Sequence, residues 1–151
     1  MNITSDIENI KIGFQGEAEI RNFFKASSIR FMQLDMVINF NGSYYSVEAK
    51  HQEYYTSPPF DGHGLPPWQV KARIELYNKT NIIPLFIVKE LNTDTLYIND
   101  LITLDMGEQA LSKTGNRILY PLTSFLKYNV KEEDYIMRKA MIIINERFKK
   151  Y

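Results

Sequence analysis

The sequence predicts an α/β fold in which a mixed central sheet is flanked by helices, with one more helix at the C-terminus. The first observation is the segment 34–50, where alternating apolar and polar residues flank Asn41-Gly42. Asn-Gly is the strongest short signal for a β-hairpin, because both turn positions need positive φ. The second is a helical pattern over 66–78 that opens with two prolines, which the first turn of a helix tolerates. The third is the apolar run 82–90, typical of a strand covered on both faces.

The bulk properties favour one globular domain. With 151 residues and 44% hydrophobic residues, the chain is long enough to bury a core. We expect a single domain over 1–151, with its core at about 13–98 and a C-terminal extension at about 99–151. The absence of cysteine excludes disulfides and thiolate metal sites.

Charge and hydropathy narrow the classes of molecule that the protein could bind. The 18 basic and 18 acidic residues cancel, which argues against indiscriminate binding of polyanions but leaves room for a local basic patch. The sequence has no apolar run of membrane-spanning length, and its first residues lack the basic and apolar pattern of a signal peptide. We therefore expect a cytoplasmic protein that does not bind membranes.

The first element expected is a helix over about 13–26. Its apolar stripe consists of Phe14, Ile20, Phe23 and Phe24. Glu17 falls on or beside this stripe, where a carboxylate is unusual. It is either a rim or first-turn acid favoured by the helix dipole, or a functional group. A short strand over 29–33 could follow.

The hairpin register places two carboxylates together. If Asn41-Gly42 is the two-residue loop, Phe40 pairs with Ser43 and Asp35 lies directly opposite Glu48, with Cβ atoms roughly 5 Å apart. Like charges directly opposed destabilise a sheet, and a bridging divalent cation removes that objection. Lys50 points to the same face, since side chains alternate along a strand.

The two faces of this hairpin differ in polarity. The face expected to pack in the core carries Met36, Ile38, Phe40, Tyr45, Val47 and Ala49. The other carries Asp35, Val37, Asn39, Tyr44, Ser46, Glu48 and Lys50. We therefore expect the two carboxylates and the ammonium on a solvent-exposed face near the strand ends.

The remaining segments complete the expected fold. Residues 51–69, rich in Gly, Pro, Tyr and His, are expected to form an irregular loop that is functional or mobile. The helix over 66–78 and the strand over 82–90 then make a right-handed crossover. Another strand is expected at 95–98. A helix over 132–149 has its apolar side at Tyr135, Ala140, Met141, Ile144 and Phe148, for packing on the sheet or for a dimer contact.

The chemistry of this group suits a hard divalent cation. Carboxylates such as Asp35 and Glu48 are ligands for Mg²⁺ or Mn²⁺, and the main-chain carbonyl of Ala49 could add a third oxygen. A bound metal acidifies a water and neutralises a scissile phosphate. Lys50 would stabilise the charge that develops at that phosphate, and we do not assign it as the general base.

The order of these features resembles the PD-(D/E)XK nuclease superfamily over about 13–90. An acid comes before a tight hairpin, and Glu48-Ala49-Lys50, a helix and an apolar strand follow. The resemblance implies a restriction-endonuclease-like α-β-β-β-α-β core. Holliday junction resolvases and VRR-type nuclease domains are closest in layout. It also implies that Glu17 joins the metal site, directly or through water, and that Gln69 orients water or phosphate. Leu34 stands where the superfamily name has a proline.

Further residues are candidates for contacts with the substrate, each with a plainer alternative. Lys71 and Arg73 could reach phosphates or could line a solvated helix face. Gln69 could instead make a local hydrogen bond at its helix start. His51 and His63 could contact substrate or handle protons, or be surface residues. The aromatics Tyr44, Tyr54, Tyr55 and Trp68 could stack on unpaired bases or serve in packing.

The sequence thus predicts a Mg²⁺- or Mn²⁺-dependent DNA endonuclease, favoured on branched or structured DNA, which could act as a homodimer. The first alternative is a non-catalytic nucleic-acid-binding or interaction module that retains the nuclease fold. The second is an interaction protein whose acidic pair is accidental. RNA as the substrate is a third.

Overall fold

The computed structural model describes residues 3–30, 32, 34–57 and 59–149. The chain divides into two compact units, residues 1–33 and 34–151. The single domain expected over the whole chain stays a prediction.

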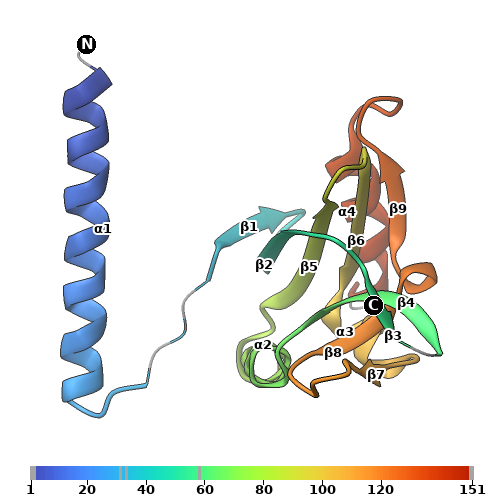
Figure 1. Ribbon diagram of the computed structural model, residues 1–151, viewed down its shortest axis with the longest axis horizontal. Helices are drawn as coiled ribbons and strands as arrows, with labels where there is room; N and C mark the ends of the chain where they lie inside the picture. The colour runs from blue at the N-terminus through green and yellow to red at the C-terminus, as the bar shows by residue number, and fades with distance from the viewer. Residues whose placement is uncertain (1–2, 31, 33, 58, 150–151) are drawn as a thin grey trace. The chain divides into compact units, whose positions relative to one another are not determined.

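The first unit is built on one long helix, α1 (Ile3–Ala26), which appears in blue in Figure 1. It starts well before the expected residue 13. Three members of the expected apolar stripe, Ile20, Phe23 and Phe24, are exposed; the side chain of Phe14 lies outside the described part. The strand expected over 29–33 is not formed at residues 29, 30 and 32, and residues 31 and 33 lie outside the description.

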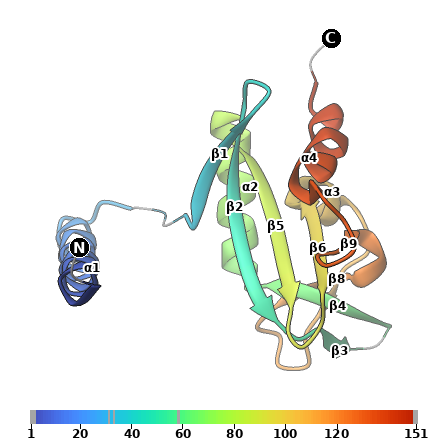
Figure 2. The same ribbon diagram turned by 90° about the horizontal axis from the view of Figure 1, so that it is seen from above.

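The second unit is organised around a mixed five-stranded sheet (Figure 2). Its strands, in spatial order, are β1 (Met36–Phe40), β2 (Ser43–Gln52), β5 (Ile83–Glu90), β6 (Thr95–Asp100) and β9 (Leu126–Asn129). The pair β2–β5 is parallel, whereas β1–β2, β5–β6 and β6–β9 are antiparallel. The parallel pair is joined through α2 (Pro67–Thr80), which is the expected strand–helix–strand unit.

The hairpin forms in the expected register. Phe40 pairs with Ser43 and Met36 with Val47. The turn residues Asn41 and Gly42 have φ of 48° and 83°, the positive values that a two-residue hairpin loop demands.

Helices cover both faces of the sheet, so the predicted fold class is confirmed. On one face α4 (Ile136–Arg147) packs Ala140, Met141 and Ile144 against Tyr45 and Val47 of β2. The opposite face is covered by α2 and α3 (Leu101–Met106), whose side chains join a second cluster. That cluster includes Val70, Phe86, Val88, Leu101 and Leu104.

The segment expected to be an irregular loop instead forms β3 (Tyr55–Ser57) and β4 (Phe60–Leu65). They join β8 (Ile118–Pro121) and β7 (Ala110–Leu111) in a second sheet of order β3-β4-β8-β7. Its glycines permit close packing rather than disorder. A Cβ on Gly62 or Gly64 would lie 2.3 or 2.0 Å from a backbone carbonyl oxygen of β8.

The C-terminal helix begins at Ile136, four residues later than expected, and the short 3₁₀ turn η1 (Leu122–Ser124) precedes β9. Glu133 lies before the helix and accepts a 2.8 Å hydrogen bond from the Asn129 amide. Tyr135, expected on the apolar side, is exposed with φ of 55°. No helix in the described part of the chain is long and apolar enough to cross a membrane.

Candidate active site

Glu48 lies inside the second unit rather than on a solvent-exposed face. Its exposure is 3%, because α2 covers this side of β2. Its Oε2 accepts a 2.8 Å hydrogen bond from Arg73 of α2, and its Oε1 lies 3.3 Å from Lys50 Nζ. The expectation of an exposed polar face is therefore wrong at Glu48. Alternation along the strand predicted which side the carboxylate takes, but not that a helix covers that side.

Asp35 approaches the same stretch from the end of β1. It lies one residue before the paired strand, is exposed, and its Oδ2 accepts a 2.9 Å hydrogen bond from the Ala49 amide. The carboxylate thus reaches the backbone of β2 between Glu48 and Lys50. The N–H and C=O of one strand residue point to the same side, so the Ala49 carbonyl faces the edge that Asp35 occupies.

The charges of this cluster balance. Two carboxylates, Asp35 and Glu48, are matched by two cations, Lys50 and Arg73. The Glu48–Arg73 pair is deeply buried on both sides, whereas the Lys50 side chain is 32% exposed. Removing one partner of a buried pair leaves an uncompensated charge and costs about 3–5 kcal/mol. Arg73 is consequently a member of the cluster, not a residue on a solvated helix face.

The donor atoms suit a hard cation in kind. Asp35 and the Ala49 carbonyl lie on one exposed edge, and the Ser46 hydroxyl beside Glu48 is buried with no hydrogen-bond partner among the described residues. Glu48 itself is paired with two cations, which a metal would have to compete with for its oxygens. Among the described residues, no group of three or more His, Cys, Asp or Glu is placed to hold a metal ion.

Glu17 belongs to the first unit, on α1. Its carboxylate lies 3.8 Å from Arg21 one turn later and is mostly exposed. Its contribution to the site stays a prediction, because it and the cluster around Glu48 lie in different units.

The other candidates on α2 sit near its start. Gln69 is half-buried, and its backbone N–H donates to the Pro66 carbonyl at 3.0 Å. The side chains of Lys71 and Trp68 are both exposed. Their assignments to water, phosphate or base contacts stay predictions.

On β2, His51 is exposed just beyond Lys50, whereas Tyr44 lies at the other end of the strand beside the hairpin turn. Of the remaining aromatics, Tyr54 is exposed, and the Tyr55 ring lies 5.5 Å from the Arg117 guanidinium carbon. The arginine contact is a packing role for Tyr55.

His63 is not a surface residue. It is fully buried on β4, with Nε2 3.1 Å from Glu90 Oε1 and Nδ1 3.2 Å from the Gln52 amide nitrogen. The Gln52 NH₂ can only donate a hydrogen bond, so the His63 Nδ1 accepts it. The ring proton is therefore on Nε2, which donates a hydrogen bond to Glu90. Burial lowers the pKa of His63, and the hydrogen bond and charge of Glu90 oppose that shift in part. The flanking Gly62 and Gly64 were the available sequence signal of a tightly packed histidine.

Comparison with known proteins gives little at the level of sequence. No protein-family model matches the chain, and no curated protein matches it. Among solved structures, the chain is similar to Hjc of Archaeoglobus fulgidus, a Holliday junction resolvase from an archaeal hyperthermophile. The TM-score is 0.41 and the identity 10%, over 72% of this chain and 88% of that chain.

Proposed function

We propose that the protein is a metal-dependent endonuclease that hydrolyses phosphodiester bonds in DNA, favoured on branched or structured DNA. One observation carries the proposal. The Asp35 carboxylate meets the backbone of β2 between Glu48 and Lys50, and Lys50 Nζ lies 3.3 Å from Glu48. The Asp35 carboxylate thus reaches the edge of β2 at Ala49, between the two residues of the E-x-K pattern that the sequence shows.

Each residue has a distinct role. Asp35, Glu48 and the Ala49 carbonyl would hold Mg²⁺ or Mn²⁺, with Glu17 assisting directly or through water. The ion, when bound, supplies charge neutralisation at the phosphate and acidifies a water. Lys50 stabilises charge on the reacting phosphate. Gln69 orients that water or phosphate.

The proposed DNA contacts are on α2 and along β2. Lys71 is an exposed cation for the backbone, and His51 and Tyr44 offer further contacts along β2. Arg73, assigned from the sequence to phosphate binding, instead donates a 2.8 Å hydrogen bond to Glu48 Oε2.

Exchange of one cation opens the site. Lys50 is the more exposed of the two partners of Glu48. Separating Lys50 from Glu48 therefore costs less free energy than separating the buried Arg73. Lys50 would then turn from Glu48 Oε1 towards the phosphate, and that carboxylate oxygen would be open to the metal. Arg73 remains on Oε2 and holds the carboxylate in its orientation.

A second candidate function is a non-catalytic nucleic-acid-binding or interaction module that retains the fold. The observation favouring it is that both Glu48 oxygens already have cationic partners and that the four charges cancel. In that case the cluster only fastens α2 to β2, and Mg²⁺ has no site there.

A substrate panel separates the two functions. Linear duplex, single strand, four-way junction and RNA are each incubated with Mg²⁺, Mn²⁺ or EDTA. We expect cleavage of DNA, strongest on the junction, with metal and none in EDTA. Asp35→Asn, which can still accept the Ala49 N–H, and Lys50→Ala should abolish cleavage while the fold is kept.

Asp94→Asn is the matched control, because Asp94 is a half-exposed acid paired with Lys131 outside the site. Cleavage by this variant should equal that by the wild type. Cleavage that persists in EDTA contradicts the metal mechanism. Calorimetry without any Mg²⁺ or Mn²⁺ binding, together with no cleavage of any substrate, selects the non-catalytic module.

A further inference from the structure

The side of α4 that points away from the central sheet carries two exposed isoleucines. Ile142 and Ile143 are 55% and 44% exposed, although the same helix already packs Ala140, Met141 and Ile144 into the core. Single apolar residues are common on protein surfaces, whereas large neighbouring apolar side chains on one face form a patch that marks a contact surface. This side of α4 is therefore a candidate for contact with another molecule.

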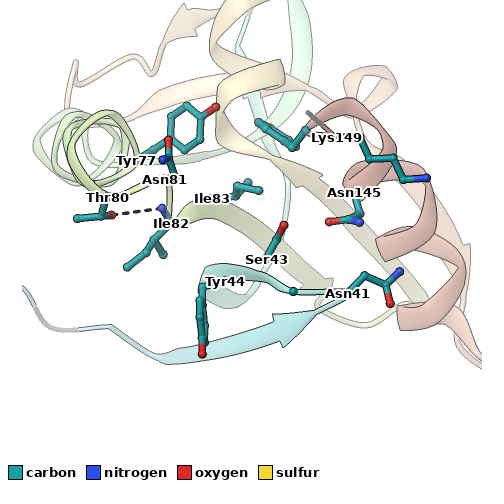
Figure 3. A pocket seen from close by; sticks show the side chains of 12 residues that line it. Asn41, Ser43, Tyr44, Tyr77, Thr80, Asn81, Ile82, Ile83, Asn145 and Lys149 are labelled. Carbon is teal, nitrogen blue, oxygen red and sulfur yellow. Dashed lines mark hydrogen bonds between the residues drawn. The ribbon is translucent and has the colours of Figure 1, made fainter. Parts of the chain in front are cut away.

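Helical geometry separates this exposed side from the side that packs inside the protein. Residues three, four and seven positions apart share one face of an α-helix. Asn145 belongs to the inner side, and Figure 3 shows its side chain turned into a pocket of about 530 Å³ where β2 and β5 begin. Four exposed residues with helical spacing make up the opposite side, which we call the outer face of α4: Lys139, Ile142, Ile143 and Glu146.

The charges of the outer face complement a second copy of the same face. Lys139 and Glu146 lie equally far along the chain from the midpoint between Ile142 and Ile143. When two copies of α4 run antiparallel about a two-fold axis at this midpoint, Lys139 of each helix lies level with Glu146 of the other. The isoleucines of both helices then meet around the axis. Every contact occurs twice, as an interface between identical surfaces requires.

The two charged side chains favour this arrangement over others. Lys139 makes no ion pair with another described residue. Glu146 lies 2.8 Å from Lys149 in an exposed pair, and a carboxylate accepts several hydrogen bonds, so it can hold both lysines. In a parallel pair of helices Lys139 would instead face its own copy, which like charges disfavour. The carboxylate also argues against a nucleic acid on this face, because phosphates select cations.

We propose that the protein forms a weak homodimer through the outer face of α4, with the two helices antiparallel and the isoleucines at the two-fold axis. The axes of helices packed in this way lie about 8–10 Å apart. The face is short, because α4 has 12 residues, so association depends on concentration. Glu48 and α2 lie on the opposite face of the central sheet and stay outside the interface. The dimer needs neither metal nor DNA.

Sedimentation of the full chain over a series of concentrations, in EDTA and without DNA, tests the association. We expect the average mass to rise from that of one chain towards that of two. Ile142→Asp should raise the dissociation constant by about tenfold or more, because two carboxylates would then be buried near the axis. Met106→Asp changes another strongly exposed apolar residue, on α3, and should leave the constant unchanged. Circular dichroism at low concentration checks that both variants fold.

Charge reversal tests the register of the two helices. Lys139→Glu and Glu146→Lys should each raise the dissociation constant by about threefold or more, because like charges then lie level with each other. The double variant Lys139→Glu/Glu146→Lys restores opposite charges and should dimerise like the wild type. Lys113→Glu reverses an exposed lysine outside the outer face and should have no effect.

Introduced thiols report the same register, because the chain contains no cysteine. Ile143→Cys lies beside its own copy across the axis and should form a disulfide-linked dimer under mild oxidation. Met137→Cys is exposed on the same helix, but it lies about 140° round the helix from Ile142 and should not cross-link.

A mass that stays at one chain at every concentration would overturn the proposal, and would mean that another molecule or another part of the same chain covers the isoleucines. The proposal also fails if the double charge variant stays monomeric or if Met137→Cys cross-links as fast as Ile143→Cys. A dimer that cleaves no DNA in Mg²⁺ contradicts the proposed function and leaves the interface standing. A protein that cleaves DNA but never associates does the reverse.

Discussion

At the scale of single residues, the cluster around Glu48 separates what strand periodicity predicts from what it leaves open. The pairing of Phe40 with Ser43 and of Met36 with Val47 followed from the Asn41-Gly42 turn, since a strand repeats every two residues. The assignment of Asp35 and Glu48 to a metal stays a prediction. Arg73 was misplaced because the distance and rotation of a helix over a sheet depend on packing between segments far apart in the chain. His63 was misplaced for the same reason, as its partner Glu90 lies on another strand.

The buried pair of Arg73 and Glu48 predicts a large loss of stability on truncation. Arg73→Met leaves Glu48 with Lys50 as its remaining cation, and we expect the free energy of unfolding to fall by about 3 kcal/mol. Urea unfolding measures this. The double variant Glu48→Gln/Arg73→Met should lose less than the sum of the two single changes, because both groups of one pair are then neutral. A change within about 0.5 kcal/mol for Arg73→Met would contradict the pairing.

His63 predicts how stability depends on pH. Its folded-state pKa is lowered, so the unfolded chain binds the proton more readily. Stability from this residue is therefore complete above its unfolded pKa of about 6.5 and is lost as the pH falls from there towards the lower folded value. Unfolding followed at pH 7.5 and pH 5 should show a smaller loss in His63→Gln than in the wild type. His51→Gln, at an exposed position, should match the wild type.

At the scale of elements, local sequence patterns predicted helices and strands correctly, whereas strands that form by pairing with distant segments were not predicted. The hairpin, α2 and β5 each have a signal inside their own sequence: an Asn-Gly turn, prolines at a helix start and an apolar run. The segment 51–69 has no such signal, because β4 becomes a strand only by pairing with β8, which lies much later in the chain. Gly62 and Gly64 suggest a loop in the sequence, but in β4 they are needed for the close approach of its backbone to that of β8.

Gly64→Ala tests this interpretation of β4. The new Cβ would meet the Ile118 carbonyl oxygen at 2.0 Å, so the backbone must shift, and we expect a loss of at least about 1–3 kcal/mol in the free energy of unfolding. Gly16→Ala is the same change on α1 with nothing within 4 Å of the added atom. It should be neutral or stabilising by up to about 1 kcal/mol. Equal effects of the two substitutions would argue against the tight β4–β8 contact.

At the scale of the whole molecule, both hydrophobic clusters are built from residues of the second unit. The sequence predicted the α/β class because every strong local signal falls in that unit. It predicted one domain from composition and length, and that single domain stays a prediction.

Removal of residues 1–33 therefore leaves both clusters complete. We expect the fragment 34–151 to unfold cooperatively, with a midpoint within a few degrees of that of the full chain, in thermal denaturation followed by circular dichroism. If Glu17 assists the proposed metal site, the fragment should also cleave DNA more slowly, and Glu17→Gln in the full chain should reproduce that loss. A fragment that folds and cleaves like the full chain would remove Glu17 from the mechanism.

The position of β1 at the border of the central sheet has a last consequence. Its outward backbone groups can template an incoming segment, which would settle about 4.8 Å away and run beside the start of the strand, where Asp35 is exposed. Sheet extension from this border and access of a long polyanion to Asp35 therefore compete for the same space. Self-association through β1 would accordingly inhibit the proposed DNA cleavage.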